Sequence, residues 1–309
     1  MKPFRKHVAL AIDGGGIRGI VSTRALSILE EYLGTPCHQV FQLAAGTSTG
    51  SIISAGIGAR LTALELTDLY LNLGEKVFPK SWRTALFPLS RYRYHAEALI
   101  NQLAAYFGHL KMGDFWTGTP PFDIVITSFD LLTNHTMVIK PWKEEYRDWQ
   151  AVKAVQASCT VPTYFPLVDG RYIDGGVGAY ANPCYLAAYE ACFCLAWEPS
   201  ETTLISLGTG RSPHAYQPEG ATKRFAWEWL TPIFGAFLQS ADDQQVHLVD
   251  TFFDQLDFRR FQVDMDESIE MDDTSQMPLL LTYGNILGEK IINDHYDRAM
   301  GIVAPKIKK

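Results

Sequence analysis

The stretch His7-Val-Ala-Leu-Ala-Ile-Asp-Gly-Gly-Gly-Ile-Arg-Gly19 contains the first strand of the predicted fold and the loop that ends it. Residues 7–12 are almost all apolar, which is typical of a parallel strand that is buried on both faces. The three glycines leave several backbone amides unobstructed, and this arrangement favours an anion. A helix from about 20 to 32 follows, with leucines on one face and Gly34 at its end.

The same alternation of strands and helices continues along the first two thirds of the chain. We expect further strands near 41–45, 122–129, 136–140, 171–174, 203–207 and 259–263, amphipathic helices near 66–77, 99–107 and 149–157, and a last helix from about 279 to 300. The predicted fold class is α/β, with a mainly parallel central sheet flanked by helices. No linker divides the sequence. We therefore expect one domain over 1–309, with its core motifs in 7–210 and a C-terminal segment, 211–309, that completes or regulates it.

Two more short motifs follow predicted strands. Gly46-Thr-Ser-Thr-Gly50 places Ser48 on a tight turn between a strand and a helix, where a nucleophilic serine can reach substrate. Asp174-Gly-Gly176 places a carboxylate at the end of another strand. Each motif also has an ordinary structural interpretation, a helix cap for Ser48 and a hairpin turn for Asp174. Together with the glycine loop, they supply the nucleophile, base and oxyanion donors that a hydrolase needs.

The glycine loop itself has an alternative interpretation, because Gly14-x-Gly16-x-x-Gly19 also fits the fingerprint of a dinucleotide-binding fold. That fold requires an acidic residue at the end of a second strand about 20 residues later, whereas Glu30 and Glu31 lie in a predicted helix. The interpretation that we favour takes three backbone amides as oxyanion donors, those of Gly14, Gly15 and Gly16.

All three motifs resemble signature blocks of the patatin-like phospholipase family. Three further segments resemble that family in the same order along the chain: Ala157-Ser-Cys-Thr-Val-Pro-Thr-Tyr-Phe-Pro166, Ala181-Asn-Pro183 and Ser206-Leu-Gly-Thr-Gly210. The resemblance spans about 7–210 and is loose after Gly210. One departure is Cys159-Thr-Val161, where small residues are more usual.

The resemblance implies a lipid acyl hydrolase of the phospholipase A type that works through a Ser–Asp dyad and an acyl-enzyme intermediate. Ser48 would attack the ester carbonyl, and Asp174 would accept its proton and then activate water. The amides of Gly15 and Gly16 would hold the oxyanion, and Arg18 would position the loop or the substrate phosphate. Because a carboxylate is a weak base, Asp174 needs dry surroundings that raise its pKa. A catalytically silent storage or binding protein on the same fold is the alternative.

Other bases and metal ions are less well supported by the sequence. In the usual order of hydrolase residues the base comes last, which makes His247 and His295 candidates, but neither lies in a motif. The acidic stretch 264–273 lacks the spacing of a calcium loop and is better interpreted as a solvated loop. We expect no metal and no cofactor.

Composition and charge limit the partners. The net charge of -7 disfavours a nucleic-acid polymer, and the expected substrate is a phospholipid or another acyl lipid. We found no signal peptide and no stretch as long as a transmembrane helix. The five cysteines have no metal-finger spacing, and Cys192 and Cys194 are predicted to be buried thiols. These features favour a cytoplasmic protein with transient contact to a membrane surface.

Two features of the C-terminal segment suggest further contacts. One is an aromatic stretch, which is either a core helix kinked at Pro232, the interpretation that we favour, or an interfacial anchor. Its large apolar residues are Phe225, Trp227, Trp229, Leu230, Ile233, Phe234, Phe237 and Leu238. The other is a loose resemblance to bacterial patatin-like antiviral effectors that cyclic nucleotides switch on. The basic residues that could contact such an activator are Lys223, Arg224, Arg259 and Arg260, although ordinary surface charges are the simpler interpretation.

Overall fold

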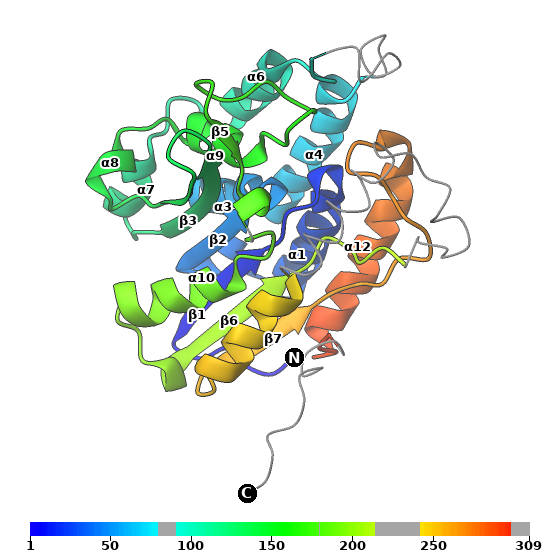
Figure 1. The fold of residues 1–309 in the computed structure, drawn as a ribbon. Coiled ribbons are helices and arrows are strands. Elements are labelled where there is room, and N and C mark those ends of the chain that lie inside the picture. The colour runs from blue at the N-terminus through cyan, green and yellow to red at the C-terminus, as the bar shows by residue number, and fades with distance from the viewer. Residues whose placement is uncertain (80–90, 179, 214–241, 298–309) are drawn as a thin grey trace, which may run out of the picture.

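The computed structural model of this protein describes residues 1–79, 91–178, 180–213 and 242–297 (Figure 1). A central sheet has the strand order β4-β3-β2-β1-β6-β7, and β5 pairs with β3 outside this path. The strands are β1 (His7–Ile12), β2 (Leu43–Thr47), β3 (Asp123–Asp130), β4 (His135–Ile139), β5 (Tyr172–Asp174), β6 (Thr202–Leu207) and β7 (Asp257–Phe261).

The pairing of the strands confirms the predicted fold class. Strand β1 is parallel to both β2 and β6, and the parallel region extends to β3 on one side and to β7 on the other. Among the strands of the described residues, β4 and β5 are the two that run antiparallel, both against β3. The inner strands are buried along nearly their whole length, as the uninterrupted apolar run at 7–12 predicts.

One detail of the register places two strand ends opposite each other. Strand β2 leaves the edge of β3 at Thr47, which is paired with Thr127. Strand β5 occupies the same edge from the next position onward, because Asp174 is paired with Ser128. The last residue of β5 therefore lies directly ahead of the end of β2, although 126 residues separate the two positions in the chain.

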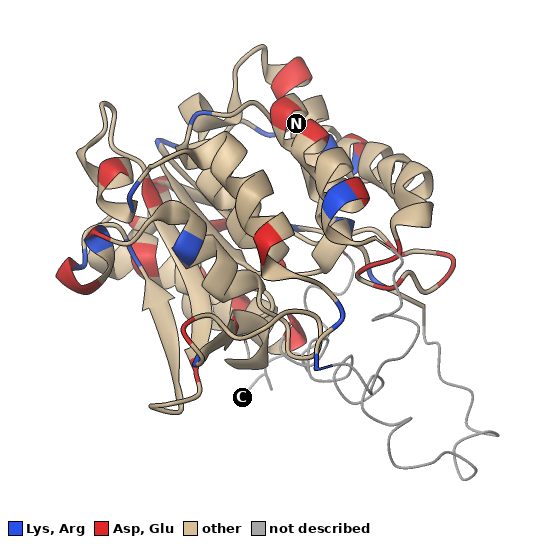
Figure 2. Cartoon of the chain, turned by 90° about the horizontal axis from the view of Figure 1, so that it is seen from above, with Lys and Arg blue, Asp and Glu red and all other residues tan. Residues whose placement is uncertain are grey.

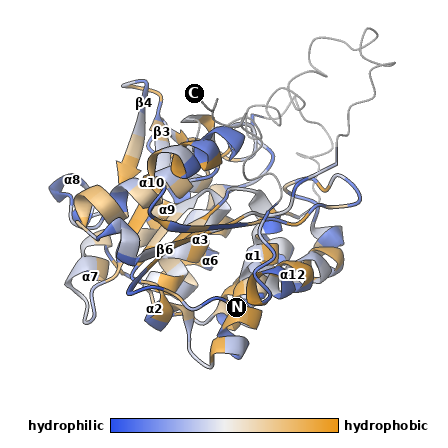
Figure 3. Cartoon of the chain, turned by 90° about the horizontal axis from the view of Figure 1, so that it is seen from below, coloured by the Kyte–Doolittle hydropathy of each residue, from blue (hydrophilic) through white to orange (hydrophobic). Residues whose placement is uncertain are grey.

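Helices cover both faces of the sheet, and together the strands and helices carry much of the hydrophobic sequence (Figure 3). One face is covered by α1 (Gly19–Leu33), α3 (Thr49–Gly58), α4 (Ala63–Val77), α6 (Ala96–Phe107), α9 (Ala151–Cys159) and α12 (Met277–Ile292). The other face is covered by α10 (Cys184–Tyr189) and helical residues 242–252. The short helices α2 (Cys37–Val40), α7 (Met112–Thr117) and α8 (Glu144–Arg147) lie in the connections.

The described part of the C-terminal segment belongs to this layered structure. Strand β7 extends the sheet beyond β6, and α12 packs along α1. The two helices approach closely at Gly284, where a Cβ atom would lie 2.6 Å from the Cβ of Arg24. Small residues at such a contact allow helix backbones to come close together.

Two local predictions are wrong. The last helix ends at Ile292 rather than near 300, and the chain turns away at Asp294, which has a φ of 54°. The thiols of Cys192 and Cys194 are half-buried and exposed, respectively, rather than buried. These two residues lie in a π-helical turn, Glu190–Cys194, whose wider spacing rotates Cys194 away from the buried face that holds Ala191.

Acidic and basic residues are interspersed over the described chain rather than gathered by sign (Figure 2). Among the residues that the structure describes, no helix has both the length and the apolar character needed to cross a bilayer. The aromatic stretch at 225–238 lies outside the described residues.

Candidate active site

Ser48 lies on a strained turn between β2 and α3. Its φ of 54° and ψ of -124° are unusual for a residue with a side chain. The glycines on either side allow this geometry, because a Cβ at Gly46 would lie 2.1 Å from the carbonyl oxygen of Gly50. A Cβ at Gly50 would lie 2.1 Å from the carbonyl oxygen of Ile12. The turn therefore has the form of a nucleophile elbow.

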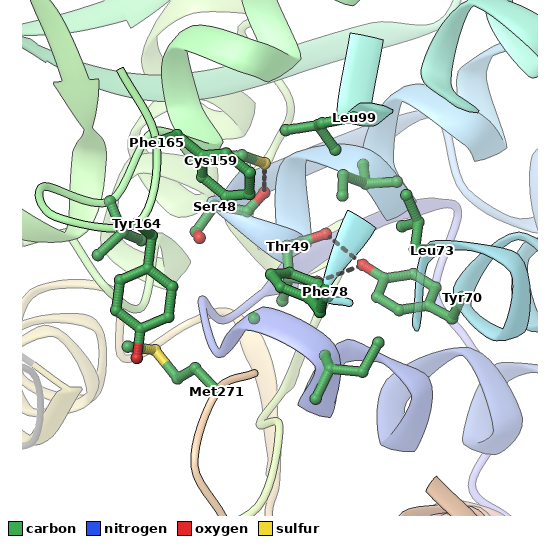
Figure 4. Close-up of a pocket in the computed structure, with 14 residues that line it drawn as sticks. Ser48, Thr49, Tyr70, Leu73, Phe78, Leu99, Cys159, Tyr164, Phe165 and Met271 are labelled. Atoms are coloured by element: carbon green, nitrogen blue, oxygen red, sulfur yellow. Dashed lines mark hydrogen bonds between the residues drawn. The ribbon is translucent and has the colours of Figure 1, made fainter. Parts of the chain in front are cut away.

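Neighbouring residues hold the backbone of Ser48 at both ends. Its amide donates to the Ser158 hydroxyl oxygen over 2.8 Å, and its carbonyl accepts from the Cys159 thiol over 3.1 Å (Figure 4). The Ser51 hydroxyl donates to the same carbonyl over 2.6 Å. Ser158 and Cys159 belong to the segment that resembles the family, but sequence reasoning gave them no role. Their polar side chains at the end of a predicted helix were the only signal.

Asp174 ends β5 with its carboxyl group buried. The backbone amide of Gly176 donates to Oδ1 over 2.8 Å, and the amide of Asp174 itself donates to the carbonyl oxygen of Thr160. Within the described residues, Oδ2 is buried without a hydrogen-bond partner. Burial raises the pKa of Asp174 from 3.8 to about 6, although hydrogen bonding by the Ser48 hydroxyl and by Gly176 lowers it.

The structure brings Ser48 and Asp174 together, as the sheet register requires. The Ser48 hydroxyl is near enough to lower the pKa of the carboxyl group, yet Oδ2 does not reach full hydrogen-bond geometry with it. Catalytic hydrogen bonds are often long without substrate and shorten in the complex. A buried carboxylate with a pKa near 6 is ionised at neutral pH and is more basic than an exposed one, so the pair is able to transfer a proton.

The three amides predicted as oxyanion donors differ in whether a protein group already accepts from them. The Gly14 amide is not free, because it donates to the carbonyl oxygen of Ala181 over 2.8 Å. Gly14 is therefore corrected from a donor to a spacer, and a Cβ there would lie 3.3 Å from the Cβ of Ser48. Within the described residues, the amides of Gly15 and Gly16 have no protein acceptor.

Arg18 holds the glycine loop. Its backbone amide and its Nε both donate to the carbonyl oxygen of Gly15, over 3.2 and 3.3 Å, and its Nη1 donates to the Ser212 hydroxyl oxygen over 3.3 Å. In a trans peptide the carbonyl and the following amide point in opposite directions. Fixing the Gly15 carbonyl therefore also fixes the direction of the Gly16 amide. Of the two roles implied for Arg18, these contacts favour loop positioning.

An apolar cavity opens beside Ser48, between α3, α4, α6 and the segment after α9 (Figure 4). Aliphatic and aromatic side chains dominate its lining: Ile17, Ile52, Leu73, Phe78, Leu99, Val161, Tyr164, Phe165 and Met271. The polar groups of the lining are largely engaged, as Figure 4 shows for Tyr70, whose hydroxyl donates to the Thr49 carbonyl oxygen over 2.9 Å. A cavity of this kind suits a hydrocarbon chain whose carbonyl group lies at Ser48.

The acidic stretch 264–273 is more than a solvated loop, and this corrects the prediction. The carbonyl oxygen of Met271 accepts from the Ile17 amide over 2.8 Å, and the Met271 side chain lines the cavity. The Asp272 carboxylate accepts from the Tyr94 hydroxyl over 2.7 Å and from Arg93 over 3.2 Å. The C-terminal segment therefore forms one wall of the site.

Two of the predicted nucleotide contacts are buried in ion pairs. The Arg260 guanidinium binds both carboxylate oxygens of Asp13 and pairs with Asp242 over 2.9 Å. The Arg259 guanidinium pairs with Asp257 and donates to backbone carbonyls near the N-terminus. Each arginine side chain is 1% exposed, so neither is available to a ligand. The acidic partners of Arg260 come from other elements, whereas the nearest acidic partner of Arg259, Asp257, lies on the same strand β7. Lys223 and Arg224 lie outside the described residues.

Neither candidate histidine lies at the Ser48 cavity. His247 is on the helical segment that covers the opposite face of the sheet, and its Nδ1 lies 3.1 Å from the Thr251 hydroxyl. His295 is exposed and lines a separate pocket with Arg211 and Lys290. Within the described residues, the carboxyl group whose pKa the Ser48 hydroxyl affects is that of Asp174.

Comparison with known proteins identifies the family. The model of the patatin-like phospholipase family matches residues 10–188, which contain the glycine loop, the Ser48 elbow and Asp174. The chain belongs to the patatin-like phospholipase family. Human calcium-independent phospholipase A2-gamma is 27% identical over 292 residues, which cover 86% of this chain and 36% of the human protein. Patatin-17 of Solanum cardiophyllum is 25% identical, over 94% of this chain and 87% of that protein.

Other similarities within the family include an intracellular phospholipase A2 of Caenorhabditis elegans, which is 30% identical over 66% of this chain and 19% of that protein. A Solanum tuberosum protein named probable inactive patatin-3-Kuras 1 is 24% identical over 93% of this chain and 88% of its own length. Among solved structures, VipD from Legionella pneumophila has a similar fold, with a TM-score of 0.50 at 11% identity. That match covers 95% of this chain and 67% of VipD.

Proposed function

We propose that this protein hydrolyses ester-linked acyl chains of phospholipids or related lipids, with Ser48 as the nucleophile and Asp174 as its base. The observation that carries the proposal is the pairing of a strained, buried serine with a buried carboxyl group whose pKa is raised to about 6, beside an apolar cavity. The phospholipases A2 among the similar proteins support a lipid substrate.

The proposed reaction has two stages. The Ser48 Oγ attacks the ester carbonyl carbon while Asp174 accepts its proton, and the Gly15 and Gly16 amides stabilise the oxyanion. Collapse of this intermediate transfers the proton from Asp174 to the leaving alcohol and leaves an acyl-Ser48. Asp174 then removes a proton from water, which attacks the acyl carbon. The bond from that carbon to Ser48 Oγ breaks, Asp174 returns the proton to Oγ, and the fatty acid leaves.

A catalytically silent storage or binding protein is the second candidate, because one similar protein is named probable inactive. Intact Ser48, Asp174 and glycine loop argue against it. The two candidates differ in one cheap measurement, covalent labelling by a fluorophosphonate probe. The hydrolase is labelled and Ser48→Ala is not, whereas a silent protein is labelled in neither form.

The experiment that tests the proposed function uses pure protein and phosphatidylcholine vesicles whose two acyl chains differ in mass. Product analysis by mass spectrometry identifies the released fatty acid and hence the position cleaved. We expect release by the wild type and none by Ser48→Ala, with circular dichroism confirming that the variant is folded. No release from phospholipids, monoacyl lipids or triacylglycerols would refute the proposal.

Two finer proposals concern the C-terminal segment and regulation. We propose that 211–309 completes the same domain, since β7 and α12 pack on β6 and α1. Activation by a cyclic nucleotide in antiviral defence would have to use other residues, because Arg259 and Arg260 are buried in ion pairs. The direct test adds cyclic di- and trinucleotides to the vesicle assay. Full hydrolysis that no nucleotide changes would remove the idea of activation and leave an unregulated hydrolase.

A further inference from the structure

Thr209 contacts the glycine loop. It lies in Ser206-Leu-Gly-Thr-Gly210, a segment that has no role in the site as described above. Its hydroxyl donates to the carbonyl oxygen of Gly14 over 2.7 Å, and its side chain is buried. The contact is direct, because a Cβ built on Gly15 would lie 2.3 Å from the Thr209 Oγ1. The hydroxyl therefore fixes the peptide between Gly14 and Gly15 from one side.

The backbone around Thr209 is itself held on the sheet. The Gly208 amide donates to the carbonyl oxygen of Phe261 at the end of β7, and the Gly210 amide donates to the Gln262 Oε1, each over 2.9 Å. Gly210 has a φ of 96°, which a residue with a side chain rarely adopts. These bonds give the Thr209 hydroxyl a fixed position relative to the strands that carry the site.

Because a peptide unit is planar, the contact at the Gly14 carbonyl also fixes the direction of the Gly15 amide. The Gly14–Gly15 bond is trans, since the cis bond in the described residues is Thr119–Pro120. In a trans peptide the amide points away from the preceding carbonyl. With the Gly14 carbonyl held by Thr209, the Gly15 amide is directed to the opposite side of the loop, and within the described residues it has no protein acceptor.

We propose that Thr209 is a positioning residue that aims the Gly15 amide at the oxyanion, as Arg18 aims the Gly16 amide. This inference rests on the proposed hydrolysis at Ser48. Without the hydroxyl, the Gly14–Gly15 peptide loses the hydrogen bond that fixes its plane, and one donor is less well aligned with the charge that develops in the transition state. The loss falls on kcat, because the ground-state ester carries little charge on that oxygen.

The test compares Thr209→Val, which keeps the shape without the hydroxyl, with Thr209→Ser, which keeps the hydroxyl. We expect Thr209→Val to lower kcat by about 10- to 100-fold with KM within about twofold, and Thr209→Ser to stay within about threefold of the wild type. The matched control is Thr202→Val, at the start of β6, the strand that precedes Thr209 in the chain. It removes a hydroxyl that donates to the Glu198 carbonyl oxygen over 2.8 Å. That control is expected to keep the wild-type kcat.

A second measurement separates positioning from general damage. Trifluoromethyl ketones form a tetrahedral oxyanion on an active serine, so their affinity should fall in Thr209→Val by the same factor as kcat/KM. The affinity for a lysophospholipid product should not change. If Thr209→Val does not fold, Thr209→Ala is measured in the same way. An unchanged kcat, or equal losses in the Val and Ser variants, overturns the inference. Absence of Ser48-dependent turnover in the wild type instead overturns the proposed function, and the inference with it.

Discussion

Replacing Asp174 by asparagine should make the protein more stable at neutral pH while it abolishes activity. Burial raises the pKa of this carboxyl group from 3.8 to about 6, so the folded protein binds the proton more tightly than the unfolded chain does. Stability therefore falls as pH rises between these two values. The loss is complete above the folded pKa. Asparagine removes this titration and keeps an oxygen for the Gly176 amide.

The magnitude follows from the size of the pKa shift. A shift of about two units at 1.36 kcal/mol per unit corresponds to about 3 kcal/mol at pH 8 and roughly half of that at pH 5. We expect Asp174→Asn to raise the free energy of unfolding by up to these amounts. The increase at pH 8 should exceed the increase at pH 5 even if the amide packs less well than the carboxyl group.

The assay is urea unfolding at pH 5 and pH 8, with vesicle hydrolysis measured on the same samples. Asp68→Asn, which changes an exposed carboxyl group on α4, is the control and should alter stability by no more than about 0.5 kcal/mol at either pH. A stability change in Asp174→Asn that is the same at both pH values would refute the reasoning. So would a loss of stability that grows with pH.

Four further predictions test other parts of the site. The wild-type kcat/KM should rise with one ionisation near pH 6 to a plateau, because only ionised Asp174 accepts the proton, and a flat profile from pH 5 to 8 would contradict the dyad. Gly16→Ala should lower kcat at least about 100-fold in the vesicle assay, because the Gly16 φ is 61° and the new Cβ would lie 2.4 Å from the Met271 carbonyl oxygen; activity near that of the wild type would show that the loop tolerates the change. His247→Ala and His295→Ala should each keep kcat within about twofold, whereas a loss as large as that of Ser48→Ala in a folded variant would point to a triad. Chelation of divalent metals should leave hydrolysis unchanged, and strict dependence on added calcium would argue against oxyanion stabilisation by backbone amides.

Much of the fold was predictable because a parallel strand that is buried on both faces has a continuous apolar sequence. Residues 7–12 and 203–207 illustrate this, since both lie within strands of nearly the predicted extent. Helix ends were harder to predict. The helix stops at Ile292 because Asp294 adopts a left-handed conformation, and Asn293 and Asp294, residue types that favour turns, were the signal that the prediction did not use.

The site was predictable in its residue types but not in its orientations. Sequence placed Ser48 and Asp174 at strand ends, but it did not indicate that β5 runs antiparallel to β3 and ends directly ahead of β2. It could not show which way a peptide faces, so Gly14 seemed as suitable a donor as Gly15 until its amide was found on the Ala181 carbonyl. The buried ion pair between Asp13 and Arg260 could not be predicted from sequence either, because the two residues are 247 positions apart and no local pattern marks either one as buried.

The contacts of Gly46 and Gly50 have a consequence for how proteins of this family are recognised. Both positions require glycine, because a Cβ atom at either one would lie 2.1 Å from a backbone carbonyl oxygen. Neither contact involves the hydroxyl of Ser48. A chain that loses its nucleophile by mutation would therefore still need both glycines in order to fold. Searches that weight the glycine pattern will group working enzymes with descendants that have lost the nucleophile, and the residue at the position of Ser48 separates the two.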